Sequence, residues 1–236
     1  MLVPDTHLRP SSNLAESLSL LPAGQRSAVS AQLASRASDS ALLGLTGITV
    51  RIDSIQVLDV HASFLSSSAD IYPVVGVVTS DTKEPFQART LNVFNGIRNG
   101  DYLSMTPQWD AYRDLADVPK FLDLHVLLMK SNQGPRNIGA ELQEAMGSNT
   151  VKTALGALAT AVGAANPLAG VISTLGASAF QLVTSLLSNE KDEQIFYGVA
   201  SFEDDPDDLG IGRPWTLRDE KPNACVKFEI LGRRAA

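Results

Sequence analysis

One stretch decides how the rest of this chain must fold: residues 151–188 read VKTALGALATAVGAANPLAGVISTLGASAFQLVTSLLS. After Lys152 the stretch contains no Asp, Glu, Lys or Arg. Asn166-Pro167 divides it in two, because proline cannot continue a helix and restricts the residue before it. The stretch therefore predicts a helical hairpin with two uncharged arms.

Each arm carries a narrow apolar stripe at helical spacing. The stripe of the first arm comprises Val151, Leu155, Leu158 and Val162, and that of the second comprises Leu168, Val171, Ile172, Leu175, Ala179, Leu182 and Leu186. The opposite faces lack the Lys and Glu of an ordinary exposed helix, and small residues recur on them. We therefore expect both faces to be covered, and the predicted contact residues are Leu175, Ser178, Gln181, Leu182 and Ser185.

Three interpretations of the uncharged hairpin remain open. The first is burial against the rest of the chain, because an apolar stripe at helical spacing is usually core. The second is an interface with a protein partner or another copy of the chain. The third is membrane insertion, although the first arm has about 16 residues where roughly 20 are needed to cross the hydrocarbon core. In composition the hairpin resembles the buried hairpins of colicin-type pore-forming domains, which implies entry into a bilayer on activation.

Strand patterns with a period of two lie on both sides of this helical block. They begin at Ile48, with a bulge or break expected at Asp53-Ser54, and end at Ile230. The clearest is Phe121 to Met129, in which alternate positions form one apolar face. Since separate domains would keep their strands contiguous, these patterns predict an α+β, mainly β fold: an antiparallel β-sandwich, C2-like or Ig-like. We expect a helical arm over residues 1–46 and a sandwich over 47–236, with the hairpin inserted at about 136–192.

Turn and loop signals between the strands complete this prediction. Asn95-Gly96 and Asn99-Gly100 are both strong local turn signals and predict a tight hairpin. Thr106 to Pro119 is expected to be a loop.

Composition excludes several classes of function. The chain has 236 residues, 44% of them hydrophobic and 19% charged, and a formal net charge of -7. This charge argues against a nucleic-acid partner, because affinity for the phosphate backbone comes from Lys and Arg. The single cysteine, Cys225, fits a reducing compartment. No basic region followed by an apolar core is found at the start, so a cytoplasmic location is expected, with export by a signal-less route left open.

Catalytic and phosphate-binding signatures are missing from the sequence, which argues against an enzyme. The sharpest catalytic candidate is a repeated pair, Asp59-Val60-His61 and Asp123-Leu124-His125. Residues two apart on a strand share a face, so on neighbouring strands the two pairs could converge into a metal or acid-base site. The alternative is a polar, solvent-facing side of the sandwich.

An acidic run follows the strand that ends near Phe202. Its carboxylates, Glu203, Asp204, Asp205, Asp207 and Asp208, are candidate calcium ligands. A β-sandwich with acidic loops at one end resembles a C2 domain, and that resemblance implies calcium-dependent membrane docking. C2 calcium sites draw aspartates from more than one loop, whereas only this run is dense here. The alternative is a solvated acidic turn without a cofactor.

These observations rank three hypotheses. The first is a non-enzymatic interaction protein whose hairpin, residues 151–188, packs on a protein partner or a second copy of the chain. The alternative is a membrane-active effector or pore-forming toxin. The third is a metal-dependent enzyme that uses Asp59, His61, Asp123 and His125.

Overall fold

The computed structural model describes residues 44–61, 67–103, 105, 108–113, 115, 118–131, 137–163, 169–187, 192–204, 208–218 and 223–234. The chain divides into two units, Met1–Leu43 and Gly44–Ala236. The helical arm expected over residues 1–46 lies outside the described residues except for its last three positions.

One sheet of the second unit is built around its first and last strands. Its strands are β1 (Leu45–Val57), β5 (Tyr102–Leu103), β6 (Gln108–Arg113), β9 (Pro214–Arg218) and β10 (Ala224–Arg234). Their order is β5-β1-β10-β9, and β6 also pairs with β1. The register of β1 against β10 shifts between Ile52 and Ser54, which confirms the irregularity expected at Asp53-Ser54. This sheet, called sheet A below, therefore joins the two ends of the unit.

The second sheet, sheet B, contains the long central strands. Its strands are β2 (Ala69–Thr79), β3 (Phe86–Thr90), β4 (Phe94–Ile97), β7 (Phe121–Ser131) and β8 (Glu193–Glu203). Their order is β3-β2-β7-β8, with β4 also paired to β2. All strand pairs of both sheets are antiparallel. The expectation of a mainly antiparallel β structure with helices is confirmed.

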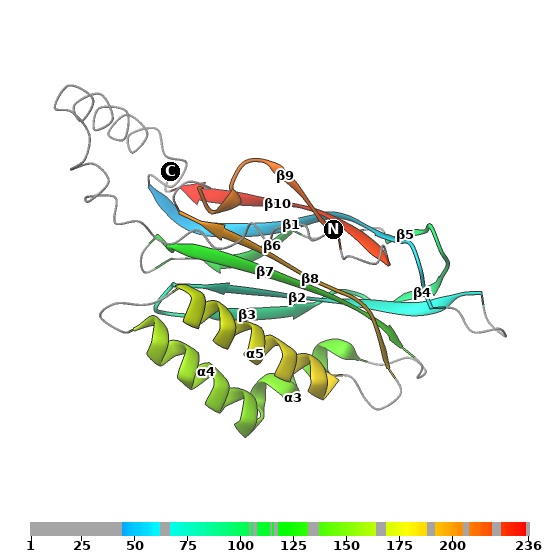
Figure 1. Cartoon of the computed structure of the whole chain (residues 1–236), viewed down its shortest axis with the longest axis horizontal. Coiled ribbons are helices and arrows are strands. Elements are labelled where there is room, and N and C mark those ends of the chain that lie inside the picture. The colour runs from blue at the N-terminus through cyan, green and yellow to red at the C-terminus, as the bar shows by residue number, and fades with distance from the viewer. Residues whose placement is uncertain are drawn as a thin grey trace, which may run out of the picture. The chain divides into compact units, whose positions relative to one another are not determined.

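Three helices, α3 (Ile138–Gly147), α4 (Asn149–Val162) and α5 (Ala169–Leu187), lie along sheet B on the side away from sheet A (Figure 1). Between the sheets, Phe202 of β8 packs against Trp215 of β9 and Phe228 of β10, with ring centroids 4.7 and 6.3 Å apart. On the other side, apolar residues of β2 and β7 form one core cluster with the three helices. Sheet B is therefore covered on both faces.

Side-chain caps start the first two of these helices. The Asn137 carboxamide oxygen accepts from the backbone N–H of Ala140 at 3.1 Å. The Ser148 hydroxyl accepts from the N–H of Val151 at 3.3 Å. Each bond satisfies a backbone donor that a helix start leaves without an internal partner.

Helices α4 and α5 lie within the predicted stretch 151–188, except for the first two residues of α4. The expected break at Asn166-Pro167 lies outside the described residues.

Two local predictions are corrected by the structure. Asn95-Gly96 is not a turn: it lies inside β4, where Gly96 has a φ of 69°. The region expected to be a loop, Thr106 to Pro119, contains strand β6, which pairs with β1. Both errors have one cause, because pairing with a distant strand overrode a local turn or loop signal.

Candidate functional site

The exposed side chains of α4 and α5 form a surface without charge, apart from Lys152 near the start of α4. We call this surface the neutral face. It comprises Thr153, Gly156, Ala157, Ala159 and Thr160 of α4 and Val171, Thr174, Ser178, Gln181, Ser185 and Leu186 of α5. Val171 is 48% exposed and Leu186 is 50% exposed, so each presents apolar area to solvent.

Hydroxyl groups on and beside the neutral face hydrogen-bond to their own helices. Thr153, Thr160 and Ser178 each donate to the carbonyl four residues earlier, at 2.8 to 2.9 Å. Thr184 and Ser185 donate to the carbonyl three residues earlier. Such bonds occupy the hydroxyl proton. Covering this surface would therefore leave these donors satisfied.

The predicted contact residues divide into two groups. Ser178, Gln181 and Ser185 are exposed, whereas Leu175 and Leu182 are half-buried against the core cluster. The buried stripe of α5 includes Ile172 and Ala179 of the predicted stripe, but not Leu175, Leu182 or Leu186. It consists of Ile172, Gly176, Ala179, Phe180 and Val183.

Helix α5 approaches sheet B closely because a glycine lies at each of two contact points. A Cβ atom on Gly76 of β2 would lie 2.4 Å from the Cδ2 atom of Phe180. A Cβ atom on Gly176 of α5 would lie 2.5 Å from the Cγ1 atom of Val78. Since side-chain carbons do not approach this closely, both glycines are needed for the observed packing. They fix which face of α5 is buried.

A polar cluster lies beneath Phe180, on the face of β7 that was predicted as either a catalytic or a solvent-facing side. Asp123 is 2% exposed and His125 is 1% exposed, so the solvent-facing prediction is wrong. The Nδ1 atom of His125 shares a hydrogen bond with the Tyr197 hydroxyl at 3.0 Å. The His125 ring stacks on Phe180, with centroids 5.1 Å apart, and Phe180 stacks on Tyr197 at 6.0 Å. The helix layer buries this cluster.

Burial sets the protonation of the cluster. It lowers the pKa of His125 from 6.5 to about 4, although the nearby Asp123 carboxylate acts in the opposite direction. Burial also raises the pKa of Tyr197, and the negative charge of Asp123 adds to this effect. At neutral pH the imidazole and the phenol are therefore both uncharged. Asp123 Oδ2 and His125 Nε2 have no hydrogen-bond partner among the described residues.

The second Asp-x-His pair lies elsewhere. His61 Nδ1 contacts Glu193 Oε1 at 2.7 Å, and the Lys130 ammonium donates to the His61 carbonyl at 2.8 Å. Burial opposes ionisation of Glu193, but hydrogen bonds from His61 and Lys130, together with the Lys130 charge, outweigh it and lower the pKa of Glu193. Along β7, Lys130 is five residues from His125, or about 16 Å. The structure does not bring the two pairs together, so the shared metal or acid-base site is not formed.

The acidic run is only partly described. Glu203 and Asp204 are exposed at the end of β8, and Asp208 begins a short 3-10 turn with a φ of 48°. Asp205 and Asp207 lie outside the described residues. Within the described ranges no group of three or more His, Cys, Asp or Glu is arranged to hold a metal ion.

Within the described residues, no helix has the length and apolar character that a membrane span requires. Helix α5, in the second half of the stretch 151–188, has 19 residues.

No family's sequence model and no curated protein matches this chain. Among solved structures, it is similar to human GIVD cytosolic phospholipase A2 in complex with methyl gamma-linolenyl fluorophosphonate, with 9% identity, a TM-score of 0.39 and 80% of this chain covered. The chain spans 17% of the length of that structure. It is also similar to a C2 domain of plant Extended Synaptotagmin 1, with 13% identity and a TM-score of 0.35, covering 81% of this chain and 98% of that domain.

Proposed function

We propose that this chain is a non-catalytic interaction protein that binds a second copy of itself through the neutral face of α4 and α5. The observation that carries the proposal is the contrast between this surface and the chain as a whole. The chain has a formal net charge of -7, so two copies repel each other over most approaches. Since the neutral face is uncharged, it is the surface on which two copies can meet with least repulsion.

Three hydroxyl groups of the neutral face favour the same interaction through their hydrogen bonds. A buried donor without a partner would oppose association by about 1–3 kcal/mol. The hydroxyls of Thr153, Thr160 and Ser178 already donate within their own helices, so docking removes no partner from them. Val171 and Leu186, at opposite ends of α5, then supply apolar area that is released from water.

The size of the surface predicts a weak, reversible dimer. Helix α5 has 19 residues and is therefore about 28 Å long, and two neighbouring helices together are about 20 Å wide. The projected area is thus about 560 Å² per copy, compared with about 800 Å² for a standard stable interface. Association should also strengthen as salt rises from about 20 to about 500 mM, because salt screens the repulsion between the two acidic chains.

Sedimentation velocity across a concentration series tests this function. We expect Val171→Asp and Leu186→Asp each to weaken association at least thirtyfold, since the substitution places a carboxylate in the interface of both copies. Val118→Asp is the matched control, because Val118 is 41% exposed but lies in the loop before β7. Leu182 is a poorer test, since its half-buried side chain packs on the core.

A chain that stays monomeric at every concentration and salt level would contradict the proposal. Flotation of the chain with lipid vesicles, lost in Leu186→Asp, would instead assign the neutral face to a membrane surface. Calcium binding by the acidic run, residues 203–208, stays a prediction that titration with Ca²⁺ can check.

A further inference from the structure

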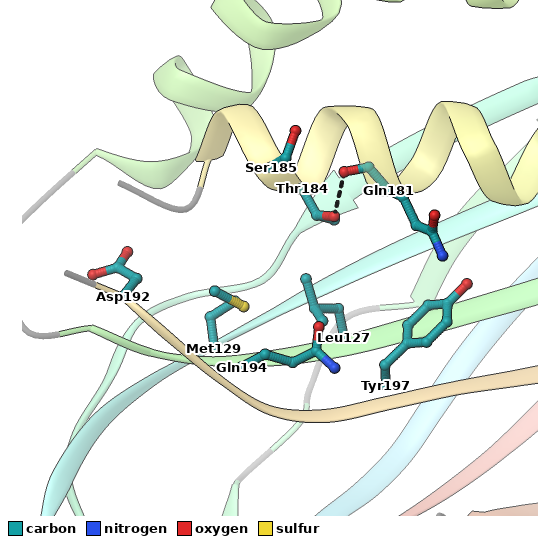
Figure 2. A pocket seen from close by; sticks show the side chains of 8 residues that line it. All are labelled: Leu127, Met129, Gln181, Thr184, Ser185, Asp192, Gln194 and Tyr197. Carbon is teal, nitrogen blue, oxygen red and sulfur yellow. Dashed lines mark hydrogen bonds between the residues drawn. The ribbon is translucent and has the colours of Figure 1, made fainter. Parts of the chain in front are cut away.

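A cavity lies between the second half of α5 and strands β7 and β8. Its volume is about 380 Å³, enough for about a dozen water molecules. The lining residues are Leu127, Met129, Gln181, Thr184, Ser185, Asp192, Gln194 and Tyr197. Figure 2 shows Gln181 reaching from α5 toward Tyr197, while Leu127 and Met129 come from β7. A cavity of this size is within the range of small-molecule sites.

The floor of the cavity is apolar. Leu127 is 2% exposed and Met129 is 4% exposed, and both belong to the core cluster under the helices. The thioether of Met129 is polarisable and makes favourable contacts with aromatic rings. The floor therefore favours a flat, ring-containing ligand over a highly hydrated one.

Several polar groups of the lining are already used within the protein. The Thr184 hydroxyl donates to the Gln181 carbonyl at 2.9 Å, and the Ser185 hydroxyl donates to the Leu182 carbonyl at 2.8 Å. The Asp192 carboxylate accepts from the Tyr72 hydroxyl at 2.8 Å. These groups hold the walls in place.

The carboxamides of Gln181 and Gln194 differ from these groups. Within the described residues neither makes a side-chain hydrogen bond, although each lines the cavity, one from α5 and one from β8. A carboxamide offers two N–H donors and one acceptor oxygen. The two glutamine carboxamides can therefore pair with a ligand group that also has both an N–H donor and an acceptor oxygen. A primary amide or a lactam edge is such a group.

Tyr197 supplies a third, rigidly held polar group. Its hydroxyl is 3.0 Å from His125 Nδ1, and its ring stacks with those of Phe180 and His125. Burial keeps the phenol protonated by raising its pKa. With its position fixed in advance, Tyr197 can bond to a ligand with little loss of conformational freedom.

We propose that this cavity binds a planar, uncharged molecule with an amide or lactam edge, of about the size of a nucleobase or nicotinamide. The ring lies on Leu127 and Met129, and the amide edge pairs with Gln181, Gln194 and Tyr197. Asp192 is the charged group of the lining, so anions are disfavoured. This site does not depend on self-association of the chain.

Nuclear magnetic resonance of the ¹⁵N-labelled full chain tests the proposal, with nicotinamide as the probe. The side-chain amide signals of Gln181 and Gln194 report directly on the two groups that should form hydrogen bonds. We expect both pairs of signals to shift and saturate with a Kd of about 1 mM, as is reasonable for so small a ligand. Nicotinate has the same ring with a carboxylate in place of the amide, and it should bind at least tenfold more weakly.

Matched variants separate the cavity from the rest of the helix layer. Gln181→Ala and Gln194→Ala should each weaken nicotinamide binding about fivefold through loss of one hydrogen bond. Gln143→Ala removes an exposed carboxamide from α3, outside the cavity, and should leave binding unchanged. Gln194 lies on β8 and not on the neutral face, so Gln194→Ala leaves the proposed dimer surface unchanged. Its effect on nicotinamide binding therefore reports on the cavity alone, whether or not the chain self-associates.

Two results would overturn the proposal. One is the absence of any shift in the Gln181 and Gln194 side-chain signals at about 20 mM nicotinamide, a concentration well above the expected Kd. The other is equal binding of nicotinamide and nicotinate, since that would show no recognition of the amide edge.

Discussion

Mild acid should destabilise this protein because the buried imidazole of His125 cannot readily take up a proton. Burial lowers its pKa in the folded chain to about 4, compared with 6.5 for the unfolded chain. Above about pH 6.5 both states are neutral at this position and no penalty arises. As the pH falls below 6.5, the unfolded chain binds a proton that the folded chain does not, until the folded pKa is reached. Stability is therefore lost between about pH 6.5 and pH 4.

The loss can be estimated from these two values. Each pH unit between them corresponds to about 1.4 kcal/mol, so the loss from pH 7 to pH 5 is about 2 kcal/mol. Carboxylates titrate mainly below this range. The expected fall of about 2 kcal/mol is the contribution of the buried His125 imidazole.

Urea unfolding followed by tryptophan fluorescence at pH 7 and pH 5 measures this difference. We expect a fall of about 2 kcal/mol in the wild type and a fall at least 1 kcal/mol smaller in His125→Gln. The control Gln143→Ala changes an exposed residue that does not titrate, and it should retain the wild-type fall. The comparison uses the difference in unfolding free energy between two pH values, so a loss of stability that is equal at both does not affect it. If His125→Gln does not fold, His125→Leu serves as the second variant. An undiminished fall in a folded His125 variant would refute the reasoning.

Further predictions concern the packing and capping of the helix layer. Gly76→Ala should lower the free energy of unfolding by about 1–3 kcal/mol, because the new Cβ atom would overlap the Phe180 ring. Gly156→Ala should instead raise the free energy of unfolding by about 0.5–1 kcal/mol, because Gly156 lies in a helix with open space around it. Thermal and urea unfolding of both variants check the pair, and equal effects would contradict the packing argument. Ser148→Ala should lower stability by about 1 kcal/mol, since it removes the cap on the Val151 N–H. Ser148→Asp, which keeps an acceptor, should retain most of the wild-type stability in the same unfolding assay.

The order of local structure could be predicted well from the sequence. Apolar spacing in residues 151–188 indicated helices, and both α4 and α5 are found there. Alternation from Phe121 to Met129 indicated a strand, and β7 spans it. These predictions succeed because helix and strand periods depend on residues close together in the chain. Strand β6 was missed because its pairing with β1 joins residues far apart in sequence.

The sequence alone determined that Asp123 and His125 share one face of a strand, and that α4 and α5 would carry almost no charge. Tertiary structure decided that this face of β7 is buried under α5 and that Phe180, not the leucine stripe, fixes the helix on the sheet. It also decided that Gln181, Gln194 and Tyr197 line one cavity. The physical reason is that periodicity sets which side chains point the same way. Whether that side is exposed to solvent or buried depends on contacts such as that of Gly76 with Phe180, which form only when segments distant in sequence pack together.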